Sequence, residues 1–495
     1  MSIDWNAIEG LRIRRLTNDS RRVRPGDTFV AWPGATSDGR DHIGEAIANG
    51  AAHVLWETRG FRWRPVWRVP NVGVPDLRRH AGEIASRLHG RPSGRLWMVG
   101  VTGTNGKTTC SQWIAQALTR AGRRCAVIGT LGYGLRPPLK SVANTTPDAL
   151  WLHARLAEFA RRGAGAVAME VSSIGLDQHR VTGVEFDVAL FTNLTRDHLE
   201  YHATMRRYRA AKARLFAWRT LKHAVVNLDD AYGRELATRI ARPGLKVIGY
   251  GFGGAGSTRA ARVAGSGLVT GPHGVRFTVT TPWGAARVAS PVLGRHNASN
   301  LLATLAVLLA SGVTLRKAVD ALADLRPVPG RMQRLGGGVK PLVVVDYAHT
   351  PDALEHVLTT LREVTAHGSR IADRESRLTC VFGCGGDRDR GKRPLMGRIA
   401  ARVADRVIVT SDNPRSEDPR RIMADILAGV RRADRELAII PERRSAVLYA
   451  VTSAQGGDVV LLAGKGHEEW QLVAGVKHPY SDVSEARRAL RGPWR

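Results

Sequence analysis

Residues 96–121 of the chain read LWMVGVTGTNGKTTCSQWIAQALTRA. The apolar run Leu96–Val101 predicts a buried strand, and the stretch from Lys107 to about Ala121 predicts a helix. The loop between them has glycines at positions 100, 103 and 106. Glycines let backbone N–H groups approach phosphate oxygens, and the helix N-terminus adds positive potential. This stretch therefore predicts an α/β domain that binds ATP.

Two side chains at the end of this loop are predicted to contact the phosphates and the metal ion. Lys107 would reach the outer phosphates, and the hydroxyl of Thr108 suits Mg²⁺. Val101 stands where the usual spacing of such loops has a glycine. A chance Gly-Lys-Thr in a glycine-rich chain is the alternative, and the strand–loop–helix context argues against it.

The length of 495 residues, 43% of them apolar, predicts about three domains that each bury a core. Proline and glycine place the boundaries near Pro92-Ser93-Gly94 and Pro327–Gly330, so we expect domains at 1–92, 93–330 and 331–495. Central strands are expected at 125–129, 166–169, 188–191 and 224–227, with a helix at about 205–217 and an antiparallel insertion within 251–290. C-terminal strands are expected at 342–346, 379–382, 406–410 and 459–462, alternating with helices. The predicted class is α/β: a central phosphate-loop ATPase domain followed by a doubly wound, Rossmann-like domain.

The charge is unusual, with 74 Lys and Arg against 44 Asp and Glu, a net of +30. Such a balance suits nucleic acid or anionic surfaces, or it reflects arginines spread over solvated faces. The basic residues are scattered and form no arm or tail, so we expect no nucleic-acid partner. The longest apolar run, Leu301–Val313, is shorter than the roughly 20 residues of a membrane span. With four cysteines and no signal-peptide pattern, a cytoplasmic protein is expected.

Polar residues follow two of the predicted central strands. Glu170 ends the strand at 166–169, and Asn193–His198 follows the next one. A carboxylate beside a phosphate loop is where a metal or water is held, although a capping role is the alternative for Glu170. His198 is a metal ligand or a satisfied polar residue. Lys212 lies in a predicted helix, where its residue type alone predicts a solvated side chain.

Three loops follow strands of the third domain: Gly385–Lys392, Asp412–Arg415 and Gly464–Glu468. Strand ends converge on one edge of a doubly wound sheet, so these Arg, Asp and Glu side chains predict a site for a zwitterion. Arg415 would clamp a carboxylate, and a simple turn is the alternative. Cys380 and Cys384 lack a second pair, so no zinc site is expected.

Ten motifs occur in an order that resembles the Mur ligase family, and within it the diaminopimelate-adding members. They are GVTGTNGKTT, MEVSS, FTNLTRDHLEYH, AKARLF, GRHNASN, PGRMQ, VVVDYAHTPDALE, VFGCGGDRDRGKRPLM, SDNPR and AGKGHE. The resemblance runs from about Asn18 to Asp482. It implies an ATP-dependent amide ligase of peptidoglycan precursor synthesis, acting through an acyl phosphate. Its substrates would be ATP, meso-2,6-diaminopimelate and UDP-N-acetylmuramoyl-L-alanyl-D-glutamate.

The resemblance also implies site residues. ATP would be bound by Gly103, Thr104, Asn105, Gly106, Lys107, Thr108, Thr109, Asn297, Arg331 and Asp346. The UDP-sugar peptide would be bound by Asn18, Ser20, Ala35, Thr36, Ser37, Asn144, Thr145, Thr146, Ser172, Gln178 and Arg180. Diaminopimelate would be bound by Arg388, Asp412, Asn413, Pro414, Arg415, Gly464 and Glu468. Thr108, Glu170, His198 and a carbamylated Lys212 (N6-carboxylysine) would hold Mg²⁺, and Lys107, Glu170, His198 and Lys212 would be catalytic.

Three alternatives remain: a lysine-adding Mur ligase, a ligase like folylpolyglutamate synthase, and a nucleic-acid-stimulated NTPase. Arg415 and the segment Asp19-Ser20-Arg21 argue against the first two. The third would explain the positive charge, but not the Asp-Asn-Pro-Arg and Gly-Lys-Gly-His-Glu loops, and no aromatic stacking platform is evident. We expect a monomer.

Overall fold

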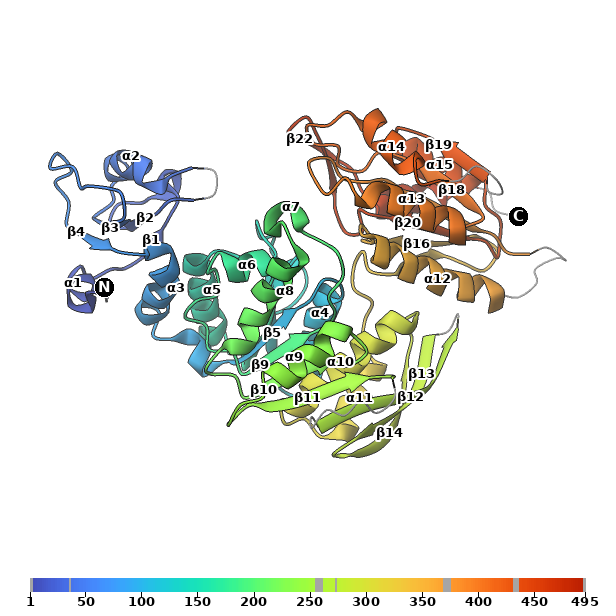
Figure 1. Cartoon of the computed structure of the whole chain (residues 1–495), viewed down its shortest axis with the longest axis horizontal. Coiled ribbons are helices and arrows are strands. Elements are labelled where there is room, and N and C mark those ends of the chain that lie inside the picture. Colours follow the sequence, from blue (N-terminus) through green and yellow to red (C-terminus); the bar gives the residue numbers. More distant parts are fainter. Residues whose placement is uncertain are drawn as a thin grey trace. The chain divides into compact units, whose positions relative to one another are not determined.

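The computed structural model describes residues 3–34, 37–253, 261–271, 274–367, 375–430 and 436–492. The chain divides into two compact units, each assembled from separate stretches. Unit 1 comprises residues 1–102, 118–190 and 210–224, and unit 2 comprises residues 103–117, 191–209 and 225–495. Figure 1 shows the chain and labels many of its helices and strands. None of the described helices is long and apolar enough to cross a membrane.

Unit 1 begins with a parallel four-stranded sheet of order β1-β2-β3-β4. Its strands are β1 (Leu16–Thr17), β2 (Thr28–Ala31), β3 (His53–Glu57) and β4 (Asn71–Val74). Its helices are α1 (Trp5–Gly10), α2 (Ile43–Ala48), α3 (Leu77–Leu88) and the 3-10 turns Ser20–Arg22 and Gly39–His42. Alternation along β2 sends Val30 into one core and Phe29 into the other. The 3-10 turn Gly39–His42 leads directly into the short helix α2.

A second set of strands in unit 1 has the order β5-β8-β6-β7. It comprises β5 (Trp97–Thr102), β6 (Cys125–Gly129), β7 (Gly132–Gly134) and β8 (Ala166–Glu170), and only β6–β7 is antiparallel. Its helices are α5 (Ala149–Arg161), α6 (Ser173–Asp177) and the 3-10 turns Pro92–Arg95 and Arg214–Ala217. The residues at the expected boundary form a 3-10 turn whose Pro92 and Ser93 are buried. β9 (Val188–Phe191), β10 (His223–Asn227), α4 (Lys107–Arg120) and α8 (Met205–Ala213) each contain residues of both units.

Unit 2 contains the predicted antiparallel insertion. β11 (Lys246–Gly251) pairs in parallel with β12 (Ala261–Gly271), and β12, β13 (Gly274–Thr281) and β14 (Gly284–Ser290) pair antiparallel in sequence order. Along β13 the buried Val275, Phe277 and Val279 alternate with exposed residues, as expected for a sheet with one solvated face. The accompanying helices are α7 (Leu199–His202), α9 (Ala231–Arg239), α10 (Arg295–Ala310) and α11 (Leu315–Ala323).

The C-terminal part of unit 2 is a six-stranded sheet of order β15-β16-β20-β17-β18-β19. All neighbours are parallel except β15–β16. The strands are β15 (Gln333–Gly336), β16 (Leu342–Asp346), β17 (Leu378–Phe382), β18 (Arg406–Val409), β19 (Glu436–Ile439) and β20 (Val459–Ala463). The helices are α12 (Pro351–His367), α13 (Lys392–Val403), α14 (Pro419–Leu427), α15 (Arg443–Thr452) and α16 (Asp482–Ala489). A separate antiparallel hairpin consists of β21 (Trp470–Val473) and β22 (Val476–Pro479).

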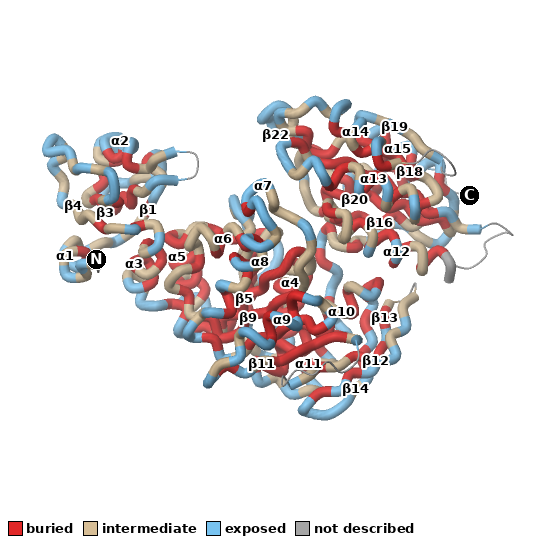
Figure 2. The backbone as a smooth tube through the Cα atoms, in the orientation of Figure 1, coloured by how far each residue is buried: buried red, intermediate tan, exposed pale blue. Residues whose placement is uncertain are grey.

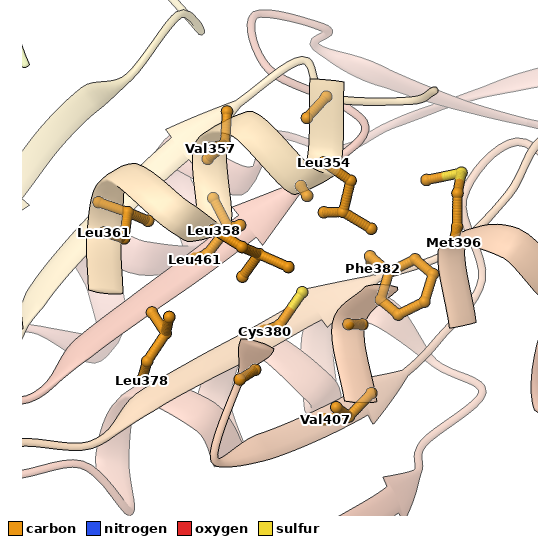
Figure 3. Close-up of a cluster of buried hydrophobic side chains, with 14 of the residues drawn as sticks. Leu354, Val357, Leu358, Leu361, Leu378, Cys380, Phe382, Met396, Val407 and Leu461 are labelled. Carbon is orange, nitrogen blue, oxygen red and sulfur yellow. The ribbon is translucent and has the colours of Figure 1, made fainter. Parts of the chain in front are cut away.

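The inner strands β17 and β20 are buried along their whole length, because helices cover both faces of the sheet (Figure 2). Figure 3 shows one of the two cores, in which Leu354 and Leu358 of α12 point toward Phe382 of β17 and Leu461 of β20. The other core holds residues of α15 and α16. The predicted doubly wound α/β class is confirmed, whereas β19 and the β21–β22 hairpin had not been predicted.

Candidate functional site

The glycines of the phosphate loop lie against neighbouring side chains. Gly103 has φ +144° and Gly106 has φ +84°. A Cβ on Gly103 would lie 1.9 Å from Thr192 Oγ1, and one on Gly106 would lie 2.7 Å from Asn300 Oδ1. The loop therefore needs glycine both for its backbone angles and for its space.

Hydrogen bonds within unit 2 fix the shape of the same loop. The Lys107 ammonium donates to the carbonyl oxygens of Gly103 at 3.0 Å and Thr104 at 2.8 Å. The backbone N–H of Asn105 donates to Asn193 Oδ1 at 2.9 Å, and Asn105 Nδ2 donates to Asp352 Oδ2 at 3.0 Å. Asn193 begins the polar stretch 193–198 noted in the sequence, but neither Asn193 nor Asp352 was assigned a role.

Thr108, Arg331 and Asp346 come together in unit 2. Arg331 Nη2 donates to Thr108 Oγ1 at 3.3 Å, and the guanidinium lies 4.3 Å from the centroid of the Tyr347 ring. Arg331 Nη1 is buried and has no hydrogen-bond partner among the described residues. Asp346 accepts from the N–H of Met332 at 2.7 Å, and burial raises its pKa above the ordinary range even though Arg331 opposes the shift. The unpartnered donor of Arg331 is suited to an anionic ligand.

Two of the predicted ATP contacts have internal roles. Asn297 lies in the first turn of α10, where its Nδ2 donates to the carbonyl oxygen of Leu293 at 2.9 Å. Thr109 lies in α4 and is buried.

His198 stands immediately before α7 in a left-handed conformation, with φ +53°. Its Nε2 lies 3.5 Å from Asp197 Oδ2 and its Nδ1 lies 3.7 Å from Glu200 Oε1. Burial would raise the pKa of Asp197, but nearby positive groups, with His198 first, outweigh it and lower the pKa to about 2. Asp197 is thus an ionised carboxylate beside His198. It lies in the polar stretch 193–198 noted in the sequence, where only His198 was assigned a role.

Glu170 ends β8 in unit 1 and is only 1% exposed. The N–H of Thr130 donates to Oε1 at 2.8 Å, and the Thr130 hydroxyl donates to Oε2 at 3.2 Å. Thr130 Oγ1 also lies 3.0 Å from Thr145 Oγ1. A Cβ on Gly129 would lie 2.3 Å from Glu170 Oε1, so the glycine makes room for the carboxylate. Thr130 had not been predicted to belong to this cluster.

Four of the residues predicted to bind the UDP-sugar peptide also gather in unit 1. Thr146 Oγ1 donates to Ser172 Oγ at 3.1 Å, and Ser172 Oγ accepts from the N–H of Gly175, which caps α6. Arg180 Nη1 donates to the Thr146 carbonyl oxygen at 2.8 Å, and Arg180 Nη2 donates to Gln178 Oε1 at 2.6 Å. Asn144 is exposed nearby in the sequence.

The N-terminal residues predicted to bind the UDP sugar are more dispersed. Asn18 and Ser37 are exposed, whereas Ser20 is buried and its hydroxyl donates to Glu45 Oε2 at 2.7 Å. Ala35 and Thr36 lie outside the described residues.

Lys212 belongs to α8 and is only 1% exposed. The prediction from residue type that the Lys212 side chain is solvated is therefore wrong. Packing around α8 decides its burial, and the local sequence holds no signal of it.

The loops after β18 and β20 meet at the carboxyl edge of the C-terminal sheet. Asp412, Asn413 and Pro414 of the first loop are buried. Asn413 Nδ2 donates to Glu468 Oε2 of the second loop at 2.9 Å. Gly464 has φ +108°, and a Cβ there would lie 2.4 Å from Asp412 Oδ2. The two loops therefore lie together at one edge of the sheet, as the order of strands and loops predicted.

Arg415 has a left-handed backbone, with φ +54°. Its N–H donates to the Leu472 carbonyl oxygen at 3.0 Å, so β21 holds this backbone in place. Its Nη1 donates to the Gly386 carbonyl oxygen at 2.7 Å. Burial lowers the pKa of Arg415, and the nearby Arg388 guanidinium adds to the shift. Arg388, by contrast, is exposed.

Comparison with known proteins bears directly on this arrangement. The Mur ligase family catalytic domain matches residues 12–89, the Mur ligase middle domain matches residues 101–308, and the Mur ligase glutamate ligase domain matches residues 330–466. A protein of Chromobacterium violaceum is 51% identical over 97% of this chain and 95% of its own length. The chain belongs to the Mur ligase family. A second relative, a protein of Pseudomonas aeruginosa, is 50% identical over 98% of this chain and 96% of its own length. Both relatives are named UDP-N-acetylmuramoyl-L-alanyl-D-glutamate–2,6-diaminopimelate ligase.

Solved structures agree with membership of the Mur ligases. A structure of UDP-N-acetylmuramoyl-L-alanyl-D-glutamate–2,6-diaminopimelate ligase is 40% identical with a TM-score of 0.68, covering 97% of this chain and 95% of that one. The MurF ligase of Thermotoga maritima in complex with ADP is 19% identical with a TM-score of 0.63, covering 97% of each chain. At 19% identity, the similarity to the second structure shows a shared fold and nothing more.

Proposed function

We propose that this Mur ligase joins meso-2,6-diaminopimelate to the D-glutamyl γ-carboxylate of UDP-N-acetylmuramoyl-L-alanyl-D-glutamate. ATP is converted to ADP and phosphate in the reaction. The observation that carries the proposal is the close relatives of that name, about half identical over nearly the whole chain. The phosphate loop and the Arg- and Asp-bearing loops of the C-terminal sheet support it.

A carboxylate is a poor electrophile because its oxygen is a poor leaving group. Transfer of the γ-phosphoryl group of ATP to the γ-carboxylate gives an acyl phosphate, which the amine of diaminopimelate attacks while phosphate leaves. Carboxylate and triphosphate repel one another, so positive groups must bring them together. The chain offers the Lys107 ammonium, the backbone N–H groups at the start of α4 and the unpartnered Nη1 of Arg331 for this task.

Mg²⁺ fits the oxygen donors of this chain. It favours one or two carboxylates together with phosphates and waters over a dedicated protein cage. Among the described residues no group of three or more His, Cys, Asp or Glu is arranged as such a cage. Thr108, Glu170 and His198 are the residues that would hold Mg²⁺, and the ion would neutralise phosphate charge.

Lys212 would act as the carbamate. Reaction of its uncharged amine with CO₂ forms an N–C bond and releases one proton, which converts a cation into an anion able to assist a metal. Lys212 is buried in α8, away from bulk water.

The amino-acid pocket would lie at the loops after β17, β18 and β20. Arg415, with Arg388, would meet the distal carboxylate of diaminopimelate, because a guanidinium pairs a carboxylate through two parallel hydrogen bonds. Asp412 and Glu468 would meet the ammonium at the same end. Asn413, Pro414 and Gly464 would shape the pocket wall.

The UDP-sugar peptide would be held by unit 1. Its polar cluster of Thr145, Thr146, Ser172, Gln178 and Arg180, with Asn144, supplies donors and acceptors for the muramoyl peptide. Asn18, Ser20 and residues 35–37 would contact the uridine nucleotide. The enzyme would act as a monomer in the cytoplasm on small-molecule substrates, without nucleic acid.

One assay tests the proposal. The purified enzyme, ATP, Mg²⁺ and the UDP-sugar dipeptide are incubated with equal diaminopimelate and lysine, and the products are identified by mass spectrometry. We expect the diaminopimelate adduct, with one ADP and one phosphate per amide bond. A predominant lysine adduct would overturn the substrate, and release of AMP and pyrophosphate would overturn the acyl phosphate. Stimulation of ATP hydrolysis by DNA or RNA in place of these substrates would favour the NTPase alternative.

A further inference from the structure

The loop after β17 is docked directly onto the loop after β18. The N–H of Gly386 donates to the Asn413 carbonyl oxygen at 2.9 Å, and the Gly386 carbonyl oxygen accepts from Arg415 Nη1 at 2.7 Å. A Cβ on Gly386 would lie 1.9 Å from the Pro414 carbonyl oxygen. The loops that carry Arg388 and Arg415 thus share one backbone contact, which admits no side chain at position 386.

A second connection between these loops passes through Glu417, just before α14. Its Oε1 accepts from the N–H of Asp387 at 2.6 Å. The same carboxylate accepts two hydrogen bonds from Arg393 of α13, at 2.8 and 3.1 Å. The Arg393 side chain is only 1% exposed, and its Nη1 also donates to Asp425 Oδ2 at 2.8 Å. Glu417 therefore joins both loops to a guanidinium that is fixed in the interior.

The two loops need such a connection because they bring like charges together. The Arg388 guanidinium contributes to the lowered pKa of Arg415, second only to burial, so the two cations interact. Asp387 and Arg415 also both have left-handed backbones, at φ +53° and +54°. That conformation is unfavourable for the long side chain of Arg415 and less so for Asp387, because aspartate is among the residues that adopt it most readily. Without a connection, repulsion and backbone preference would both move the loops apart.

We infer that Glu417, held by two hydrogen bonds from Arg393, is a positioning residue. It sets the spacing of Arg388 and Arg415 and thereby the affinity for diaminopimelate. This inference rests on the proposed function, because it concerns the same pocket. Glu417 acts through Asp387 and Arg393 and makes no contact of its own with the ligand. A carboxylate is required there, because both Arg393 nitrogens and the Asp387 N–H are donors.

The test is Glu417→Gln in the full-length enzyme, with steady-state kinetics for each substrate varied in turn. The amide keeps the size of the side chain but places an NH₂ donor against the donors of Arg393. We expect KM for diaminopimelate to rise about tenfold, equivalent to about 1.4 kcal/mol. KM for ATP and for the UDP-sugar dipeptide should stay unchanged, and kcat should fall less than KM rises.

Glu442→Gln is the matched control. Glu442 caps α15 in the same six-stranded part of unit 2 by accepting from the N–H groups of Arg444 and Ser445. Within the described residues, no hydrogen bond or ion pair joins its side chain to either loop. The same chemical change there should lower thermal stability and leave KM for diaminopimelate unchanged. If both variants change KM equally, the effect is general loosening of the domain and the inference is wrong.

Asp387→Asn keeps the inference testable should Glu417→Gln fail to fold. Asp387 is exposed, and asparagine tolerates the left-handed backbone. The change weakens the bonds that Ser416 donates to the Asp387 carboxylate at 2.7 and 3.2 Å. It should raise KM for diaminopimelate alone, by less than Glu417→Gln. An unchanged KM in both variants overturns the positioning role, whereas a wild-type enzyme that does not use diaminopimelate overturns the proposed function itself.

Discussion

The Lys465 ammonium lies 2.9 Å from Glu468 Oε2, and the Lys465 side chain is completely buried. The same ammonium donates to Asn413 Oδ1 at 3.0 Å, so Lys465 links the loops after β18 and β20. Glu468, assigned to the ligand from the motif alone, is already paired with a cation of its own loop. Its other oxygen, Oε1, accepts a hydrogen bond from the Tyr347 hydroxyl at 3.4 Å.

Lys465→Met should destabilise the fold as well as the pocket. Removing one partner of a buried ion pair leaves an uncompensated charge and costs about 3–5 kcal/mol. Chemical denaturation of the purified variant measures the loss. Lys477→Met is the control, because Lys477 is exposed on β22, and it should change stability by less than about 0.5 kcal/mol. Equal stability of the two variants would contradict the role given to Lys465.

Arg415→Ala should raise KM for diaminopimelate by at least about tenfold, since losing one member of a desolvated charge pair costs about 2–5 kcal/mol. Arginine and alanine both have a Cβ, so the left-handed backbone at position 415 is equally unfavourable for the two. The substitution therefore reports the loss of the guanidinium alone. KM for ATP and the UDP-sugar should stay nearly constant, and lysine should remain a poor substrate. Arg420→Ala, an exposed arginine of α14, is the control. An unchanged diaminopimelate constant would remove Arg415 from the pocket.

Lys212→Ala should lose most activity, and added short carboxylic acids should partly restore it by supplying the missing anion. Ligase assays with and without acetate measure this. Lys222→Ala removes a lysine whose side chain is 61% exposed and paired with Asp187, and it should keep its activity with no response to acetate. A fully active Lys212→Ala enzyme would show that this buried lysine has only a structural role.

Gly103→Ala should weaken ATP binding at least about tenfold, a loss of about 1.4 kcal/mol. The new Cβ would lie 1.9 Å from Thr192 Oγ1, so the loop must shift and its N–H groups lose their alignment. Gly122→Ala is the control: its φ is +96°, yet no atom lies within 4 Å of the new Cβ. It should cost stability without affecting ATP. Equal ATP affinity in both variants would refute the geometry of the loop.

His153→Gln should make folding stability less sensitive to acid. Burial lowers the pKa of His153 from 6.5 to about 4, and the hydrogen bond to the Thr182 carbonyl oxygen only partly offsets this. Between these pH values the unfolded chain binds a proton that the folded chain does not, so stability falls as pH falls. The loss attributable to His153 is about 3 kcal/mol over that range. Glutamine keeps the donor to Thr182 and does not titrate.

Denaturant unfolding at pH 7 and pH 4.5 checks the sign. The wild type should lose more stability between these values than His153→Gln does. His356→Gln should change the pH dependence in the opposite direction. In the wild type the bond with Asp352 raises the pKa of His356, so protonation of His356 stabilises the folded state in acid. The same pH dependence in the wild type and His153→Gln would show that His153 does not titrate in this way.

Much of the fold could be predicted from local patterns. Strands β6, β9 and β16 were expected within the bounds that they have, because apolar runs between turn residues indicate buried parallel strands. The phosphate loop and the three C-terminal loops were also visible, since strand ends of a doubly wound sheet converge. In the N-terminal region β3, β4 and α3 were not predicted, and the Trp- and Arg-rich segment 58–70 separates the two strands.

The sequence by itself determined the α/β class, the motif order and the residues that can carry the chemistry, because these depend on neighbours along the chain. Only the tertiary structure decided which charges are paired and desolvated. Burial of Lys212, the contact of Lys465 with Asn413 and the ion pair of Arg393 with Glu417 appear in no local pattern. Arg393 and Glu417 are 24 residues apart, and only the packing of α13 beside the loop after β18 makes them partners. A side chain's charge is set by its type, but its dielectric surroundings and its partner are set by whatever the fold packs against it.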